Sequence, residues 1–199
     1  LLRMPVFLPI VVLIAVIYAP ATGVRGLWAG PYLVDMYGAD TILIGNVTLV
    51  MALSMVAGPL IYGPLDTLFR TRKWVAMACG LVCVATLAIL ALQPQAGIGA
   101  ATVLLVSIGL SAGAYGLLMA HARAFFPPHL IGRGATLMNF FSIGGAGVMQ
   151  VATGAVVTAA SDPARPAAAY SALFGFYALV IGAALCIYLF STDAPPERP

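Results

Sequence analysis

The sequence predicts an all-α integral membrane protein with six transmembrane helices. Of its 199 residues, 62% are hydrophobic and only 8% are charged, and the mean hydropathy is +1.06. A soluble domain is about half apolar and about a quarter charged, so a soluble fold of this composition would lack polar residues to cover its surface. The apolar residues also form runs of about 20, the length of a membrane-spanning helix. Helices are expected because lipid offers no partner to unpaired backbone groups.

The first span is expected at residues 5–33. Its apolar run contains Arg25 and continues beyond it, which makes it longer than the apolar region of a signal peptide. A cleavable signal peptide stays an alternative, because Arg3 precedes the run and "APA" follows at residues 19–21. The chain begins with Leu1, and we expect it to start inside a longer protein.

Turn signals separate the remaining spans of a single bundle, which we assign to residues 1–199. A charged segment at residues 63–73 follows the second apolar run, and "QPQAG" and "SDPARP" interrupt later ones. The polar, proline-rich residues 191–199 are expected to form a frayed tail. After the first span, the expected helices cover residues 42–62, 74–92, 98–120, 135–160 and 167–190.

The basic residues are concentrated on one side of the expected membrane. The opposite side has Arg165 as its one basic residue. Because cytoplasmic loops carry an excess of Lys and Arg, both termini are expected in the cytoplasm. The net charge of +3 therefore reflects the excess of basic residues in the loops on one side of the membrane and indicates no nucleic-acid partner. The residues on the cytoplasmic side are Arg3, Arg70, Arg72, Lys73, Arg123, Arg133 and Arg198.

No set of residues in the sequence indicates an enzyme. Cys79 and Cys83 share a helix face, but no histidine or acid lies beside them, so no metal site is expected. The sequence also shows no nucleophile triad and no phosphate-binding loop. We expect neither catalytic activity nor a cofactor.

The charged segment "GPLDTLFRTRKW", residues 63–74, resembles the signature loop of the major facilitator superfamily. In that family a glycine, an aspartate and several basic residues connect the second and third helices of each half. Thr67 and Phe69 depart from the pattern. The second half of these transporters carries a degenerate copy of the loop, so the resemblance implies a C-terminal half, helices seven to twelve. The matching residues are Gly63, Asp66, Arg70, Arg72 and Lys73.

Two further segments are similar to bacterial anion and metabolite transporters of this superfamily. They are "RGLWAGPYLVDMYG", residues 25–38, and "HARAFFPPHLIGRGATLMNFFSIGGAG", residues 121–147. The resemblance implies one half-bundle of the major facilitator fold. It implies a symporter or antiporter that moves a small anionic solute by alternating access across a bacterial inner membrane. The partner would be an N-terminal six-helix half in the same protein, or a second bundle. The alternative is a six-helix membrane protein that does not transport.

Two roles are open for the charged segment. Asp66 can form a latch with an arginine whose strength differs between inward-open and outward-open states, which would bias that equilibrium. Alternatively, Arg70, Arg72 and Lys73 only set the topology and bind anionic lipid headgroups.

Arg25 is the clearest candidate for solute binding. An arginine within a span is energetically costly and usually faces a cavity or a partner, and its guanidinium matches carboxylate or phosphate. Trp28 and Tyr32 follow at three and seven residues and are expected on the same helix face. The alternative is that Arg25 extends to the outer interface, where Trp28 and Tyr32 would be interfacial aromatics.

Uncharged polar residues on three other spans are expected to line a central cavity. Asn46 lies on the second span, Tyr115 on the fourth, and Asn139 and Gln150 on the fifth. Their spacing places them in stripes with several serines. The alternative is that these groups bond neighbouring helices. No acid lies within the expected spans, so the sequence indicates no proton carrier there. The serines of the stripes are Ser54, Ser107, Ser111 and Ser142.

Overall fold

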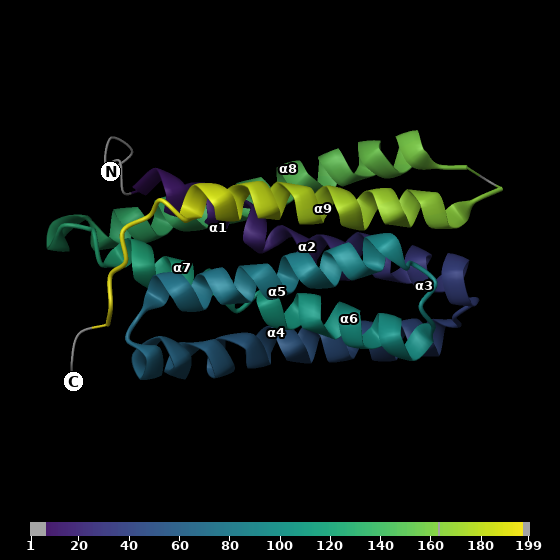
Figure 1. Ribbon diagram of the computed structural model, residues 1–199, viewed down its shortest axis with the longest axis horizontal. Coiled ribbons are helices and arrows are strands. Elements are labelled where there is room, and N and C mark those ends of the chain that lie inside the picture. The colour runs from purple at the N-terminus through teal and green to yellow at the C-terminus, as the bar shows by residue number, and fades with distance from the viewer. Residues whose placement is uncertain (1–6, 163, 197–199) are drawn as a thin grey trace.

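The computed structural model describes residues 7–162 and 164–196, and these residues form helices without any strand. Six helical segments are long and apolar enough to cross a membrane, which confirms the predicted fold class. They lie side by side along one axis, and α1 begins at the same end of the bundle where the C-terminal segment ends (Figure 1). The chain is a multi-pass membrane protein. The six segments are Phe7–Tyr37, Thr41–Phe69, Arg72–Leu92, Ile98–Arg123, Pro128–Ala160 and Pro166–Tyr188.

The first span is not one regular helix. It consists of α1 (Phe7–Ile17), α2 (Ala19–Gly23), the π-helical turn η1 (Val24–Trp28) and α3 (Ala29–Tyr37). Pro20 lies in the first turn of α2, and a proline has no N–H to continue the hydrogen bonds of the preceding helix. The hydroxyl of Thr22 donates to the carbonyls of Tyr18 (3.3 Å) and Ala19 (3.2 Å) beside this break.

The second span is longer than the predicted residues 42–62. Helix α4 (Thr41–Phe69) continues through Pro59 and Pro64, and only two residues separate it from α5 (Arg72–Leu92). The prediction placed a turn at the glycine-proline pair. That boundary is wrong because a membrane favours continued helix, in which most backbone groups stay paired even around a proline.

The fourth span also has a break. It consists of α6 (Ile98–Ser111) and α7 (Ala114–Arg123). The fifth span comprises the 3-10 turn η2 (Pro128–Leu130) and α8 (Ile131–Ala160), and the sixth is α9 (Pro166–Tyr188).

Glycines allow the closest helix contacts in the bundle. Helix α4 packs on α6 and α7, and a Cβ added to Gly58 would lie 2.4 Å from the Leu110 carbonyl oxygen and 3.1 Å from Gly113. Helix α8 packs on α1, where a Cβ on Gly145 would lie 2.0 Å from the Ala15 carbonyl oxygen. Only glycine permits these approaches, as is typical of membrane helices.

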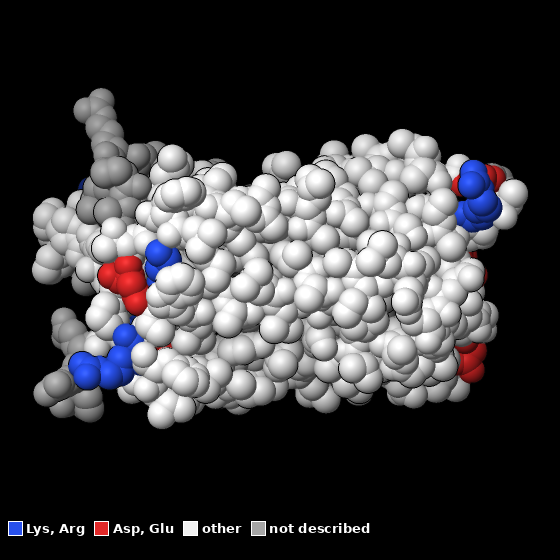
Figure 2. All heavy atoms as spheres, viewed as in Figure 1, with Lys and Arg blue, Asp and Glu red and all other residues white. Residues whose placement is uncertain are grey.

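Charged side chains gather at the two ends of the bundle. On the face that Figure 2 shows, the broad middle region carries no charged atom. This distribution agrees with an apolar band that contacts lipid between two polar ends.

Candidate functional site

The two interrupted spans lose regular α-helical geometry near their middles. The first span breaks at Tyr18 and again in η1, and the fourth breaks at Ala112 and Gly113. In a membrane, such irregular backbone is tolerated where it is buried in protein or lines a cavity, and transporters often form substrate sites there. The breaks therefore lie at about the same depth of the bundle in both spans.

Arg25 lies in the π-helical turn close to the middle of the first span. Val24 and Ala29 on either side are fully buried, whereas the three consecutive residues Arg25, Gly26 and Leu27 are exposed. Arg25 forms no salt bridge or hydrogen bond with any other described residue. A guanidinium at this depth needs water, a ligand or another chain as its partner.

A tyrosine and an asparagine from different spans meet beside these breaks. The Tyr115 hydroxyl, just beyond the α6–α7 break, donates to Asn139 Oδ1 of α8 at 3.0 Å. The Tyr18 ring, at the first break, lies 5.6 Å from the Tyr115 ring. Asn139 is exposed, so its amide group can still donate to a solute.

A second group of polar residues joins η1 to α8. The indole Nε1 of Trp28 donates to the Thr153 hydroxyl at 3.2 Å, and that hydroxyl donates to the Gln150 carbonyl at 3.0 Å. Gln150 is half-buried and faces α2, since its Cγ would lie 3.9 Å from a Cβ on Gly23. Arg25 makes no contact with these six residues that the structure records, but it lies in the same π-helical turn as Trp28. We call the six residues together with Arg25 the seam cluster: Tyr18, Arg25, Trp28, Tyr115, Asn139, Gln150 and Thr153.

Tyr32 does not share the face of Arg25, and that expectation is wrong. Its side chain is fully buried, and its hydroxyl donates to the Pro94 carbonyl at 2.8 Å. Its ring packs against Tyr170 and Phe174. The intervening π-helical turn holds more residues per turn than an α-helix, so it rotates α3 relative to the face that a regular helix would give.

Several other predicted cavity residues have structural partners. The Ser54 hydroxyl donates to Met51 O at 2.7 Å, and the hydroxyls of Ser107 and Ser111 donate to carbonyls of their own helix. These serines satisfy themselves within a helix instead of facing a cavity. Asn46 is exposed on α4 and makes no hydrogen bond with a described residue, so the structure does not join it to the seam cluster.

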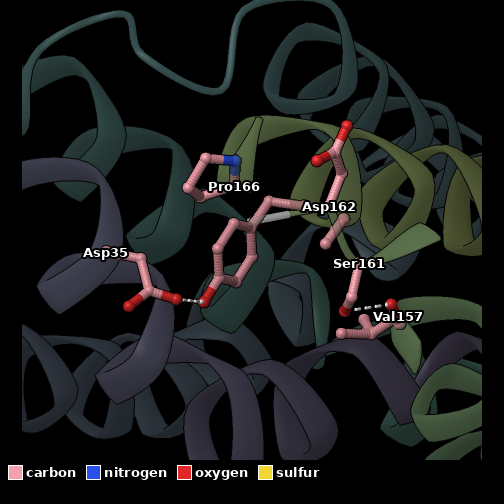
Figure 3. A pocket seen from close by; sticks show the side chains of 7 residues that line it. Asp35, Val157, Ser161, Asp162 and Pro166 are labelled. Atoms are coloured by element: carbon pink, nitrogen blue, oxygen red, sulfur yellow. Dashed lines mark hydrogen bonds between the residues drawn. The ribbon is translucent and has the colours of Figure 1, made fainter. Parts of the chain in front are cut away.

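A pocket of about 350 Å³ lies at the end of the bundle where α3, α8 and α9 meet (Figure 3). Its polar groups already bond one another. Asp35 accepts from the Tyr170 hydroxyl, Ser161 donates to Val157 O at 2.7 Å, and Asp162 pairs with Arg165 at 3.0 Å. Two of the lining residues, Asp35 and Asp162, carry carboxylates, which disfavour an anionic ligand.

At the opposite end, the predicted charged loop is mostly helix. Gly63 and Asp66 lie within α4, Arg70 takes the left-handed conformation (φ 54°) that ends it, and Thr71 caps α5. Asp66 is buried and its carboxylate lies 3.4 Å from Nε of Arg72. The expectation that every acid lies outside the spans is thus wrong for Asp66, which lies three residues before the end of α4, and for Asp35, which lies in α3 within the first span.

The C-terminal tail is held against this end of the bundle. Asp193 accepts hydrogen bonds from the Thr71 hydroxyl and from the backbone N–H of Lys73 (3.0 Å). The Lys73 ammonium donates to the carbonyls of Leu189 and Ser191, both at 2.7 Å. The expectation of a frayed tail is therefore wrong for residues 191–194, because the first turn of α5 offers donors that the tail accepts. We call these interactions the tail contact.

His121 and Arg72 extend the tail contact to α7 and α4. The buried imidazole of His121 lies 2.8 Å from the Thr192 carbonyl and 2.7 Å from the Tyr188 hydroxyl. Since a carbonyl only accepts, Nε2 donates to Thr192 and, in the neutral ring, Nδ1 accepts from Tyr188. Arg72 donates to Ala194 O at 3.3 Å while it pairs with Asp66. Four spans thus meet at the tail contact.

Hydrogen bonding also lowers the pKa of Asp193. Burial by itself raises the pKa of this carboxyl. The hydrogen bonds from Thr71 and from the backbone N–H groups of Lys73 and Ala194, together with the electrostatic attraction of His121, outweigh it. The net pKa lies below the ordinary value of 3.8. The ionised carboxylate is therefore the form that holds the tail.

Sequence reasoning missed Tyr18, Thr153 and the tail contact. Pro20, in the middle of an apolar run, was a signal for the break beside Tyr18. Thr153 extends the predicted stripe of Asn139 and Gln150 by three residues, which one helical turn would have indicated. No local pattern indicated that Asp193 contacts residues about 120 positions away.

The sequence matches no protein-family model and no curated protein. The structure is similar to the xylose transporter XylE from E. coli in an inward-open conformation, with a TM-score of 0.78 and 12% sequence identity. The similarity covers 94% of this chain and 48% of that one, so this chain spans about half the length of the transporter. At this identity the likeness shows the fold alone. The described residues therefore have the fold of one six-helix half of a major facilitator transporter.

Proposed function

We propose that this chain forms half of a secondary transporter that moves a small anionic solute by alternating access. Arg25 carries the proposal, because it is an exposed cation near mid-span without a partner among the described residues. Its neighbours in the seam cluster supply uncharged donors. A guanidinium binds carboxylate or phosphate through a fixed pair of N–H groups, while Tyr115 and Asn139 would orient the rest of the solute.

Alternating access requires a second bundle that covers the seam cluster from the other side. In this proposal the partner is the N-terminal half of the same protein or a separate six-helix bundle. The least buried spans of the described chain are α4 and the fifth span, where 22% of the apolar 18-residue stretch is buried. Both leave surface for lipid or a partner. The excess of basic residues at the tail-contact end favours a cytoplasmic position for that end, and a bacterial inner membrane is the proposed location.

The tail contact and the Asp66–Arg72 pair are proposed to act as a latch on the cytoplasmic side. They connect four spans through polar bonds that a rigid-body movement of one span would break. A latch biases the equilibrium only if its strength differs between the two states. Asp66→Ala is therefore expected to slow transport while solute binding persists. Leu68→Ala is the control on the same turn, because Leu68 is 71% exposed and makes no polar contact with the latch, and it should leave the transport rate unchanged.

Uptake into proteoliposomes that contain the complete protein tests the anion proposal. The substrates would be radiolabelled acetate, lactate, phosphate and nitrate, with neutral xylose as the comparison. Arg25→Gln should abolish uptake of the anion, and Arg25→Lys should retain part of it because the charge remains. Uptake of xylose that does not depend on Arg25 would contradict the anionic solute. Absence of uptake for every solute would favour a membrane protein that does not transport.

Tyr115 and Asn139 supply a second test that is independent of charge. Tyr115→Phe removes the hydroxyl that donates to Asn139 but keeps the ring against Tyr18. We expect the KM for the solute to rise about fivefold to tenfold, as for one lost hydrogen bond, while the bundle loses only about 0.6 kcal/mol of stability. Equal KM values for the parent protein and the Tyr115→Phe protein would indicate that the solute binds elsewhere.

A further inference from the structure

An apolar groove separates α4 from α5 at the end of the bundle that carries the tail contact. It encloses about 390 Å³. The groove runs lengthwise between two membrane-spanning helices, which lie next to each other in Figure 1. Its walls include Tyr62, Leu65, Phe69, Trp74, Ala78 and Val82.

The packing of the two helices explains why side chains do not fill this groove. Gly58 allows α4 to approach Gly113 of the fourth span, because a Cβ added to Gly58 would lie only 2.4 Å from the Leu110 carbonyl oxygen. Helix α5 packs mainly on α9 instead. The two helices therefore pack mainly on different neighbours, and large apolar side chains on both remain exposed: Phe69 is 63% exposed and Trp74 is 56% exposed.

Two basic residues are sequence neighbours of groove-lining residues, since Arg70 precedes Thr71 and Lys73 precedes Trp74. Arg70 is exposed and connects α4 to α5. The Lys73 ammonium lies 5.3 Å from the centre of the Trp74 ring, and its two hydrogen-bond acceptors are uncharged carbonyls. The acids nearby are used by other groups, since Asp66 pairs with Arg72 and Asp193 accepts from Thr71 and the backbone. Among the described residues, Arg70 and Lys73 have no carboxylate partner.

We propose that this groove binds an anionic phospholipid. One acyl chain lies along the apolar wall of α4 and α5, and the phosphate contacts Arg70 and Lys73. Trp74 lies at the boundary between them, at the depth where tryptophan is favoured in membranes. The charge at the groove end selects an anionic headgroup over a zwitterionic one, because basic residues beside the membrane surface attract anionic lipids. This site depends on the fold and the membrane but not on the proposed transport.

Tryptophan fluorescence gives a direct test, because the chain has two tryptophans, Trp28 and Trp74. The Trp28→Phe protein, which retains Trp74 alone, would be reconstituted in phosphatidylcholine vesicles that contain lipids with brominated acyl chains. Bromine quenches tryptophan on contact. Brominated phosphatidylglycerol should quench Trp74 at about a tenfold lower mole fraction than brominated phosphatidylcholine, given two basic contacts. Equal quenching by the two lipids would overturn the proposal.

Variants separate the charge contribution from the groove. Arg70→Gln should lower the preference for phosphatidylglycerol about threefold, whereas Arg165→Gln, at the opposite end of the bundle, should not change it. Arg70 is outside the tail contact, so this variant does not depend on tail attachment. Ala78→Phe should fill the groove and prevent quenching by low levels of either lipid.

Three further outcomes would overturn the lipid site. A preference that survives both Arg70→Gln and Ala78→Phe would place the lipid elsewhere. Displacement of the lipid by free glycerol phosphate would indicate a headgroup site without an acyl chain in the groove. The Trp74→Phe protein, which reports from Trp28 alone, should show no headgroup preference, and an equal preference there would indicate general enrichment of lipid around the protein.

Discussion

Replacing Asp193 by alanine tests whether the tail contact is a stable part of the fold. The carboxylate accepts from the Thr71 hydroxyl, from the backbone N–H of Lys73 at 3.0 Å and from that of Ala194 at 2.9 Å. It thus accepts hydrogen bonds at the start of α5 in the way that a capping residue does. Loss of such a cap costs about 0.5–2 kcal/mol. Because the carboxylate accepts three hydrogen bonds, we expect about 1–2 kcal/mol, which lowers the docked-to-undocked ratio of the tail about 5-fold to 30-fold.

Amide hydrogen exchange of the protein in lipid nanodiscs measures this ratio, since local opening sets the exchange rate of the tail amides. In the Asp193→Ala protein, amide exchange at residues 189–194 and at Lys73 should accelerate by the same factor, about 5-fold to 30-fold. Asp162→Ala is the matched control, because this carboxylate accepts from Arg165 (3.0 Å) and from the Ala164 N–H (2.9 Å) outside the tail contact. Exchange at the tail that stays within about twofold of the parent protein, with unchanged helicity, would refute the reasoning.

Three further predictions concern backbone positions and pH. Gly145→Ala should destabilise the bundle by about 1–3 kcal/mol, because its Cβ would lie 2.0 Å from Ala15 O. Thermal unfolding measures this, and the control Gly144→Ala should show no loss of stability, because an added Cβ there has no neighbouring atom within 4 Å. Gly38→Ala should cost about 1–2 kcal/mol in the same assay, since Gly38 ends α3 at φ 62°, a conformation unfavourable to L-residues. The contribution of Asp193 to the tail contact should be fully present above pH 3.8, the ordinary pKa of its carboxyl. It should be lost as the pH falls below that value, through the lowered pKa of the folded state. Hydrogen exchange corrected for intrinsic rates would measure this loss, and protection of the tail amides that is lost already at about pH 6 would contradict the prediction.

The candidate site was only partly predictable. Arg25, Tyr115, Asn139 and Gln150 could be selected because each is a polar residue in an apolar run, and such residues usually contact protein, water or ligand. Their partners could not be selected. The bond between Tyr115 and Asn139 joins two different spans, and the break between α6 and α7 that orients Tyr115 has no proline to indicate it.

The sequence by itself determined that the chain crosses the membrane six times, because each span depends on the local hydropathy of about 20 residues. The tertiary structure decided how those spans are shaped and joined. A π-helical turn rotates Tyr32 away from Arg25, α4 continues to Phe69, and the tail returns to α5. These features arise from packing and hydrogen bonds between residues far apart in the chain, which a local pattern does not contain. Solvent preference is local and can be read from composition, whereas the partner of each polar group is set by the neighbouring helices.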